Sequence, residues 1–482
     1  MDTRAAIPVS LPRANPTTSY WQDPPDSQLS DYLSSSSVPE IADVVIIGSG
    51  ITGAGIAWNL LGGEDGVHTP KNQEKVVMLE ARQACSGATG RNGGHTKAAS
   101  YRTFLTNSSI SLLTAKKIAR LEYATIKAVH AFAAEHKIPC DSWIGDTVDI
   151  VYDKQQWEAS LRGIEAIREV FKGEQDESTV GRYNIWSAEE ARDRFYVDGK
   201  DVVGAVSYEA GSLSAYKFVI GVLKLCLEKG LELYTRTPAT KVSRGNDGLW
   251  DIETPRGNIK AKKVVLATNG YTAFLNTGFQ GSIVPLRGQI TAHRPGRNMP
   301  SEGLPGTYSF IYSNGYEYMI PRPPGSKYAG DIVIGGGLVK ADEEGLYEFG
   351  ETDDTSVNPV ISKYLTETTP RLFGQRWGED DKEGRVRREW TGIMGYSSDG
   401  FPFVGEVEGD QNKGLYVCAS FQGHGMVLCW LCAKALVGIM REKDKDEELE
   451  WFPDVFRVSG ERMKRRFEGR LNTKVDEVDG SS

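Results

Sequence analysis

The segment from residue 42 to residue 80 constrains the fold of this 482-residue chain more than any other. Residues 42–47 are an apolar run rich in β-branched side chains, and residues 48–53 read GSGITG. Residues 54–61 follow with a helical pattern of small and apolar residues, and residues 75–80 form a second apolar run that ends in a carboxylate. Strand, glycine turn, helix, strand and acid in this order predict a dinucleotide-binding βαβ unit.

Each residue type in this unit has a physical role. Gly48 permits the tight turn, Gly50 lets the backbone approach a pyrophosphate, and Gly53 allows close packing of helix against strand. The helix N-terminus offers unpaired N–H groups and partial positive charge to phosphates. Glu80 is placed to accept hydrogen bonds from ribose hydroxyls, and a polar insertion at 63–75 accounts for its distance along the chain. The predicted dinucleotide-binding residues here are Gly48, Ser49, Gly50, Ile51, Thr52, Gly53 and Glu80.

A glycine-rich stretch, residues 86–97 with the sequence SGATGRNGGHTK, follows the acid closely. It is either a flexible surface loop or a backbone shaped to pass close to a ligand. An NAD-dependent dehydrogenase should continue with further βαβ units, whereas residues 80–82 lead directly into this stretch. A flavin dinucleotide is therefore favoured as the cofactor, and NAD remains the alternative.

At this point the sequence resembles the D-amino-acid-oxidase-like superfamily of FAD-dependent oxidoreductases, in particular the amine oxidases similar to gamma-glutamylputrescine oxidase. In that branch SGATGRNGG follows the ribose-binding acid, and a Ser-Tyr-Trp, here residues 19–21, precedes the first strand. Four later segments agree with the resemblance in order and spacing: residues 263–271, 284–289, 390–405 and 419–426.

The resemblance implies an α/β fold, α+β overall. A Rossmann-like FAD-binding domain would combine with a discontinuous substrate domain built on a mixed or antiparallel sheet. The implied division is an N-terminal extension at 1–40, FAD-binding segments at 41–105, 200–275 and 390–445, substrate-binding segments at 106–199 and 276–389, and a C-terminal tail at 446–482. We expect the first 40 residues and the last 15 or so to be peripheral or flexible.

The resemblance also implies further cofactor contacts. They are Ala81, Arg82, Ser86, Gly87, Thr89, Gly90, Arg91, Asn92, Gly93, Gly94, Lys241, Val242, Ala267, Thr268, Asn269, Gly423, His424, Gly425 and Met426. Lys241 and Val242 lie in the segment that pairs with adenine in the family. Residues 415–418 read as a strand, 423–425 as a turn and 426–440 as a helix. The N-terminus of such a helix would stabilise negative charge on a reduced flavin.

Lys97, Tyr318, Arg322 and His424 are the candidate catalytic residues. Residues 308–312 and 316–320 form a predicted hairpin with aromatic alternation, and one aromatic face would line the substrate pocket. Ordinary cross-strand packing is the alternative. Lys97 matches the place of an arginine that contacts substrate in sarcosine-oxidase-like members.

Departures from the family pattern refine the prediction. Residues 390–399 contain no cysteine, and Arg91 stands about where a histidine links the flavin in dimethylglycine-dehydrogenase-like members. We therefore predict non-covalent FAD, although His95 and Cys85 lie close to this place in the sequence. Val427 replaces a lysine that holds the substrate carboxylate in sarcosine oxidases. A larger amine, with a remote anionic group, fits better than a plain N-methyl amino acid.

The predicted activity is FAD-dependent oxidation of the C–N bond of an amine or amino acid to an imine. Hydride would move to flavin N5, and oxygen or another acceptor would reoxidise the flavin. A biosynthetic tailoring oxidase acting on a larger amine-containing metabolite and a non-catalytic flavin-binding homologue remain alternatives.

Composition narrows the remaining classes. The net charge of −9 argues against a nucleic-acid partner, and no apolar run approaches the about 18 residues of a membrane span. Six cysteines and no secretory signal predict a cytoplasmic protein with reduced thiols. Cys429 and Cys432 lie in an apolar helical run and read as core thiols, and the histidine spacing predicts no metal site.

Overall fold

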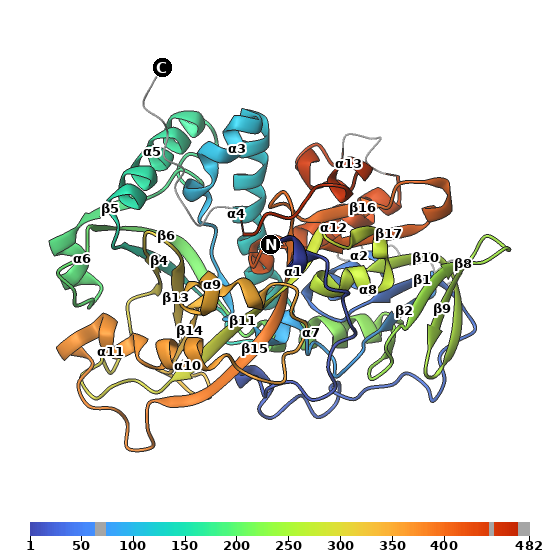
Figure 1. The fold of residues 1–482 in the computed structure, drawn as a ribbon, viewed down its shortest axis with the longest axis horizontal. Coiled ribbons are helices and arrows are strands. Elements are labelled where there is room, and N and C mark those ends of the chain that lie inside the picture. The colour runs from blue at the N-terminus through green and yellow to red at the C-terminus, as the bar shows by residue number, and fades with distance from the viewer. Residues whose placement is uncertain (63–73, 443–447, 471–482) are drawn as a thin grey trace.

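The computed structural model describes residues 1–62, 74–442 and 448–470, and these build two sheets side by side (Figure 1). The predicted insertion at 63–75 therefore lies largely outside the described residues. The first sheet, on the right in Figure 1, has the strand order β16-β17-β10-β1-β2-β7, with β9 beside β10 and β8 beside β9. Its strands are β1 Ile41–Ile47, β2 Val76–Leu79, β7 Glu232–Tyr234, β8 Lys241–Arg244, β9 Trp250–Thr254, β10 Gly257–Leu266, β16 Phe403–Glu406 and β17 Leu415–Ala419.

The centre of the first sheet is parallel and buried. β1 pairs in parallel with both β10 and β2, so that Ile47 lies opposite Leu266 and Leu79. β10 also pairs in parallel with β17. Continuous runs of Val, Ile and Leu are what a parallel strand covered on both faces requires. The carboxyl ends of these four strands therefore meet at one edge, where ligands bind in open α/β sheets.

Helices cover the faces of both sheets (Figure 1). They are α1 Asp2–Ala5, α2 Ile51–Leu60, α3 Phe104–Ile110, α4 Leu112–Glu135, α5 Lys154–Phe171, α6 Ala188–Arg194, α7 Ala215–Glu228, α8 Thr272–Leu275, α9 Asp342–Gly345, α10 Pro359–Thr366, α11 Thr368–Phe373, α12 Cys429–Met440 and α13 Gly460–Met463. α2 packs so closely on α12 that a Cβ added at Gly55 would lie only 3.0 Å from the Ala433 side chain. Among the described residues no helix is long and apolar enough to span a membrane.

The second sheet is mostly antiparallel, with the order β15-β11-β14-β13-β12-β4-β6-β3 and β5 beside β6. Only β12 and β4 pair in parallel within it. Its strands are β3 His95–Thr96, β4 Trp143–Val151, β5 Asn184–Ser187, β6 Gly204–Ser212, β11 Ile283–His293, β12 Thr307–Ile311, β13 Tyr316–Pro321, β14 Ile332–Gly335 and β15 Val386–Ser397. The expected combination of a Rossmann-like unit with a mixed sheet is thus confirmed.

Some boundaries differ from the sequence expectation. β3, β6 and β15 pair in the second sheet, so the change from one sheet to the other does not fall at residues 105, 200 and 390. The helix expected near residues 105–138 is two helices. Ser111 adopts extended backbone between α3 and α4, and its hydroxyl accepts a hydrogen bond from the Thr114 N–H at 3.0 Å. A serine that caps a new helix in this way ends the preceding one.

The expectation that the first 40 residues are peripheral is wrong, and most of the last 15 residues lie outside the described residues. Tyr20 and Trp21 are buried, and Trp21 Nε1 donates to the carbonyl of Asn92 at 2.5 Å. At the other end, Phe467 is 1% exposed and packs 5.8 Å from the Phe349 ring. Short polar or aromatic segments without periodicity gave no signal of this packing.

Candidate active site

One large cavity follows the carboxyl edge of the first sheet and continues beneath the second. Its volume is about 1020 Å³, at the upper limit of the roughly 300–1,000 Å³ typical of small-molecule pockets. Gly48, Glu80 and Ala267 line the cavity directly after β1, β2 and β10. The cavity is therefore large enough for a dinucleotide together with a substrate.

Most of the residues predicted from the sequence line this cavity. They are Gly48, Ser49, Gly50, Ile51, Thr52, Glu80, Ala81, Arg82, Gly87, Thr89, Arg91, Asn92, Gly93, Gly94, Lys97, Ala267, Thr268, Asn269, Tyr318, Gly423, His424, Gly425 and Met426. Segments hundreds of residues apart in the sequence thus meet around one space.

Three predicted contacts lie behind the cavity wall and shape it. A Cβ at Gly53 would lie 1.9 Å from the carbonyl oxygen of Gly48, and one at Gly90 would lie 2.0 Å from that of Cys85. Both glycines permit close backbone packing and do not face the cavity. Ser86 is buried, and its carbonyl accepts a hydrogen bond from Arg82 at 2.9 Å.

Lys241, Val242 and Arg322 are not brought to the cavity either. Lys241 is exposed on β8 and pairs with Glu253, while Ala239 lines the cavity two residues earlier. Arg322 is buried against Asp141, with 2.6 Å between its nitrogen and the carboxylate oxygen. Its guanidinium therefore has an internal partner away from the cavity.

The dinucleotide end has the donors and acceptors that a nucleotide needs. The Glu80 carboxylate accepts from the Ser49 hydroxyl at 2.6 Å and the Arg82 N–H at 2.9 Å, which fixes it at the cavity edge. Gly50 caps α2 without a side-chain hydrogen bond, and Thr89 Oγ1 accepts from the Ile51 N–H at 3.1 Å. A helix N-terminus and a fixed carboxylate at strand ends fit a pyrophosphate and a ribose.

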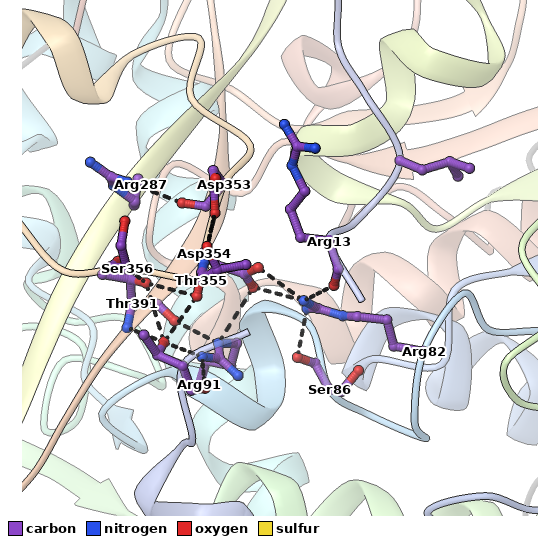
Figure 2. A network of polar contacts seen from close by, with 12 residues as sticks. Arg13, Arg82, Ser86, Arg91, Arg287, Asp353, Asp354, Thr355, Ser356 and Thr391 are labelled. Carbon is purple, nitrogen blue, oxygen red and sulfur yellow. Dashed lines mark hydrogen bonds and ion pairs between the residues drawn. The ribbon is translucent and has the colours of Figure 1, made fainter. Parts of the chain in front are cut away.

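A buried ion network holds the glycine-rich stretch in place (Figure 2). Asp354 is fully buried and accepts two hydrogen bonds from Arg82, at 3.0 and 2.9 Å, and lies 3.7 Å from Arg91. Arg91 also donates to the carbonyl of Thr391 on β15, and Arg82 donates to that of Ser86. Burial lowers the pKa of Arg91 to about 10, against the opposing effect of Asp354. The network thus connects the glycine-rich stretch to the second sheet.

The turn expected near the flavin ring lies where β17 leads into α12. Gly423 has a positive φ of 74°, and Gly425–Val427 form a 3₁₀ turn before α12 begins at Cys429. The helix therefore starts three residues later than its apolar pattern suggested. On the facing side, a Cβ at Gly93 would lie 2.6 Å from the Tyr318 ring. The absence of a side chain at residue 93 therefore lets this backbone pack directly against the Tyr318 ring.

Lys97 lines the cavity from beside β3 but is already paired. Its ammonium forms an ion pair with the fully buried Asp149 and donates to the Ser309 hydroxyl at 2.5 Å. Asp149 also accepts from the hydroxyls of Tyr101 and Tyr208, at 2.7 and 2.9 Å. Burial lowers the pKa of Lys97, and Asp149 opposes that effect. Lys97 therefore contributes little net charge to the cavity.

Two histidines face the same part of the cavity in neutral form. Burial, with Lys97, Arg470 and Arg102 adding to it, lowers the pKa of His424 to about 4. Burial, Lys97 and His424 lower the pKa of His95 well below its usual value. His95 Nε2 lies 2.7 Å from the Thr307 hydroxyl. Both rings are neutral near pH 7, so neither supplies positive charge.

The two strands of the aromatic hairpin place their aromatic side chains differently: one strand packs them in the core and the other lines the cavity with them. Tyr308 and Phe310 on β12 are fully buried and stack on each other in the core of the second sheet. Tyr316 and Tyr318 on β13 line the cavity. Only the aromatic face of the return strand therefore reaches the site.

Several cavity residues gave no usable signal in the sequence. They include Leu11, Pro12, Arg102, Glu122, Gln156, Ala239, Gln289, Ser309, Val339, Tyr396 and Arg470. Glu122 differs from the others in one respect, because it is a charged residue on the apolar face of α4, which is an unusual place for a carboxylate. The others lie in loops or strands whose pattern fits ordinary packing.

Replacing Glu122 by glutamine is expected to stabilise the protein above pH 7. Glu122 is 6% exposed, its carboxylate accepts a hydrogen bond from the Ser100 hydroxyl, and burial raises its pKa to about 7. Because the folded pKa exceeds the unfolded value, the wild-type unfolding free energy falls as pH rises from about 4.5 to 7. The variant should gain about 2–3 kcal/mol at pH 8 and little at pH 4.5, measured by urea unfolding. Glu135→Gln, at the exposed end of the same helix, should leave the unfolding free energy unchanged at both pH values. An equal gain at pH 8 and pH 4.5 for Glu122→Gln would contradict the raised pKa of Glu122.

The cysteines and metal-binding residue types suggest no further chemistry in the site. Burial raises the pKa of Cys429, which lines the cavity, to about 12, and that of Cys432 also rises. Cys85 is fully buried outside the cavity lining. In the part of the chain that the structure describes, no three His, Cys, Asp or Glu residues could hold a metal together.

Comparisons with known proteins agree with this geometry. The family described as DAO, FAD dependent oxidoreductase, matches residues 43–439. The chain is 24% identical to the probable oxidoreductase OrdL of Rhizobium meliloti, over 85% of each chain. It is 22% identical to the gamma-glutamylputrescine oxidoreductase of Escherichia coli, over 83% of each.

Solved structures share the fold. Glycine oxidase from Geobacillus kaustophilus superposes with a TM-score of 0.65 at 18% identity, covering 87% of this chain and 99% of that one. L-proline dehydrogenase from P. horikoshii gives a TM-score of 0.64 at 19% identity, covering 87% and 98%. The NAD-dependent alternative is not supported, since the matched family is FAD-dependent. This chain belongs to the DAO family of FAD-dependent oxidoreductases.

Proposed function

We propose that this protein oxidises the C–N bond of an amine or amino acid to an imine, in the chamber between Lys97, Tyr316, Tyr318 and His424. The observation that carries the proposal is that this chamber is continuous with the dinucleotide site in one cavity. Relatives whose names state an amine or amino-acid substrate, such as glycine oxidase, support the substrate class.

The residues that would hold FAD follow the cavity in order. The turn at Gly48–Gly50 and the start of α2 suit the pyrophosphate, Glu80 the ribose, and the wall near Ala239 the adenine. Gly93, Gly94 and the turn at 423–426 suit the flavin ring. Bound FAD supplies a hydride acceptor at N5 and passes the electrons to oxygen or another acceptor. The buried, unreactive cysteines support non-covalent binding.

The chain's own residues would select the neutral amine. Oxidation of a C–N bond needs the nitrogen lone pair, so an ammonium must lose its proton before reaction. Arg102 and Arg470 line the cavity, while Asp149 is neutralised by Lys97. Nearby positive charge lowers the pKa of a bound amine. Tyr316 and Tyr318 would cover the reacting carbon and exclude water.

Replacing Lys97 by methionine is expected to shift the pH profile of kcat, measured at saturating substrate, upward by about one unit, with a roughly tenfold loss of kcat at pH 7. The change keeps the apolar stem but leaves the Asp149 carboxylate uncompensated beside the chamber, where it favours the ammonium form of the substrate. Lys127→Met, which removes an exposed partner of Glu209, is the matched control. An unchanged profile in folded Lys97→Met would contradict this role, and Lys97→Arg should restore the wild-type profile.

An amine panel tests the proposed activity. Primary, secondary and N-methyl amines and amino acids are incubated with the FAD-loaded protein in air and with an artificial electron acceptor. Carbonyl and released amine are measured chemically. We expect a carbonyl and, in equal amount, ammonia from a primary amine or an amine from an N-substituted one, for at least one substrate class. Normal FAD binding without turnover across the panel would instead favour the non-catalytic alternative, and turnover confined to large metabolites would favour a tailoring oxidase.

A further inference from the structure

The cavity also extends to three helices of the second sheet, where α3 packs against both α4 and α5 (Figure 1). Each helix contributes one polar side chain to the cavity wall: Asn107 of α3, Glu122 of α4 and Gln156 of α5. These three residues, which we call the helical subsite, are 7%, 6% and 7% exposed. Thr106 and Arg162 also line the cavity but are exposed, so the cavity reaches the surface at these helices.

Glu122 is a cavity carboxylate that the proposed nucleotide site does not use. Among the described residues two carboxylates line the cavity, and the other, Glu80, suits the ribose. The Glu122 carboxylate accepts a hydrogen bond from the Ser100 hydroxyl and forms no ion pair within the described part of the chain. A carboxylate has about four sites that accept hydrogen bonds. Most of the hydrogen-bonding capacity of Glu122 is therefore unused by the fold.

Other buried carboxylates of this protein have a cation beside them. Asp354 pairs with Arg82 at 2.9 Å, and Glu348 pairs with Arg287 at 2.6 Å. An ionised carboxylate without such a partner is costly in the interior. Burial raises the pKa of Glu122 to about 7, and no cation in the described part of the chain opposes that effect. A cation that reached this carboxylate would supply the missing partner and favour its ionised form.

The two amides of the helical subsite add further acceptors. The Gln156 side chain has no hydrogen-bond partner among the described residues, whereas its backbone carbonyl accepts from the Ser160 hydroxyl at 2.7 Å. Asn107 Nδ2 donates to the Thr103 hydroxyl at 3.4 Å, and the Asn107 amide oxygen has no partner in the same part of the chain. The helical subsite thus offers one carboxylate and two amide oxygens to a ligand.

The positive side chains of this part of the cavity have other positions or partners. Lys97 pairs with Asp149. The guanidinium carbon of Arg102 lies 5.9 Å from the centroid of the Tyr316 ring, and Arg162 is exposed at the surface. Among the residues that the structure describes, none of these cations forms an ion pair with the carboxylate of the helical subsite. The fold therefore leaves the charge of this carboxylate to be balanced by a ligand.

We propose that the helical subsite binds a second amino group of the substrate in its ammonium form, with Glu122 as the anionic partner, so that the substrates are diamines. This proposal rests on the proposed function, whose cavity it shares. An ammonium has three N–H donors and no acceptor, which matches a carboxylate and two amide oxygens. Its hydrogen bonds to a carboxylate are charge-assisted and about twice as strong as neutral ones. The larger amine expected from the sequence then carries its remote charge as an ammonium rather than as an anion.

Charge would also orient such a substrate in the cavity. Glu122 keeps the proton on the amino group that it binds, because a carboxylate raises the pKa of a nearby amine. Arg102 and Arg470, which also line the cavity, favour the neutral form of the amino group at the reacting end. The two ends of a diamine thus differ in protonation, and only the neutral end has the lone pair that oxidation requires.

Binding without turnover tests the proposal. The flavin of the FAD-loaded protein is first reduced without oxygen, so that no amine can be oxidised. Butanediamine, hexanediamine and octanediamine are then titrated by calorimetry at pH 8, with hexylamine, aminohexanol and aminohexanoate as compounds that lack the second ammonium. We expect at least one diamine to bind at least tenfold more tightly than each of these three.

Variants of the helical subsite locate that preference. Glu122→Gln should reduce the preference for the diamine at least tenfold, and Glu122→Asp, which keeps the charge, should retain part of it. Gln156→Leu and Asn107→Leu should each weaken diamine binding roughly threefold. Glu135→Gln is the matched control, because Glu135 is exposed at the end of the same helix, and its preference should equal that of the wild type. Since Glu122→Gln is expected to be more stable than the wild type at pH 8, unfolding cannot account for a lost preference.

Two results would overturn the proposal. One is a wild-type protein that binds no diamine more tightly than hexylamine or aminohexanol. The other is a folded, FAD-loaded Glu122→Gln protein with the diamine preference of the wild type. Because oxidation is not measured, a diamine preference that depends on Glu122 would stand even if no amine were oxidised. Oxidation of amines without any such preference would instead support the proposed function and refute this subsite.

Discussion

Asp354→Asn is expected to lower the unfolding free energy by about 3–5 kcal/mol and to remove most of the bound flavin. Asp354 is the shared carboxylate of two buried arginines, Arg82 and Arg91, whose side chains are 6% and 2% exposed (Figure 2). Removing the charge of one partner leaves the other buried charges uncompensated, which costs far more than the net value of the original pair. Urea unfolding and flavin absorbance per protein measure the two effects.

The same network positions the predicted cofactor loop, so stability and flavin content should fall together. Arg91 donates to the carbonyl of Thr391, and Arg82 donates to that of Ser86 at the start of the glycine-rich stretch. Asp353→Asn is the matched control, because among the described residues the Asp353 side chain accepts hydrogen bonds from Thr355 alone, at 2.8 and 2.6 Å. It should cost about 1 kcal/mol and leave flavin content unchanged. A stable, fully flavin-loaded Asp354→Asn protein would refute the role given to this network.

Gly48→Ala is expected to weaken FAD binding at least tenfold. Gly48 has a φ of +111°, which L side chains rarely adopt, and its added Cβ would lie 2.5 Å from the carbonyl oxygen of Ala267. Both β1 and β10 end at this point, so the turn cannot move without shifting the edge that carries the nucleotide site. The measurement is the dissociation constant of FAD from the refolded or FAD-depleted protein, by recovery of flavin fluorescence.

Gly173→Ala separates backbone strain from the close contact. Gly173 also has a positive φ, +75°, but no atom lies within 4 Å of an added Cβ. Its replacement should cost about 1–2 kcal/mol of stability and leave FAD affinity unchanged. Similar FAD affinity in Gly48→Ala and Gly173→Ala would show that the turn does not form the nucleotide site. Gly93→Val should also strongly weaken FAD binding, because a Cβ added at residue 93 would lie 2.6 Å from the Tyr318 ring. A Cβ added at Gly425 has more room, since its nearest neighbour would be Cys429 Sγ at 3.1 Å.

The sequence predicted the parts of the site that the backbone itself forms. A strand, a glycine turn and an acid specify their own geometry, and the cavity lining includes Gly48, Gly50 and Glu80 as expected. Gly93 and Gly94 follow the same logic, since a close approach requires the absence of a side chain. These signals are local in the sequence, and local signals can be read from one chain.

The substrate chamber could not be predicted in the same way. Arg322 directly follows β13, the strand that carries Tyr318. Its side chain nevertheless pairs with Asp141, which is 181 positions away in the sequence. Arg470 reaches the cavity only because Arg462 and Phe467 anchor the C-terminal segment on distant residues. Lys97 was expected to contact substrate, and its pairing with Asp149 depends on how β3 and β4 meet β6. Contacts between residues far apart in the sequence decide which charges face the ligand, and a local sequence pattern does not predict such contacts.

Anaerobic reduction of the bound flavin tests the central claim most directly. The purified FAD-loaded protein is mixed without oxygen with the amines and amino acids of the panel in turn, and its visible absorbance is followed. We predict loss of the oxidised flavin band at one equivalent of substrate per flavin, and its return on admitting air or another acceptor. An oxidised spectrum that persists with every amine tested, in protein that binds FAD normally, would contradict the assignment of this chain as an amine-oxidising enzyme.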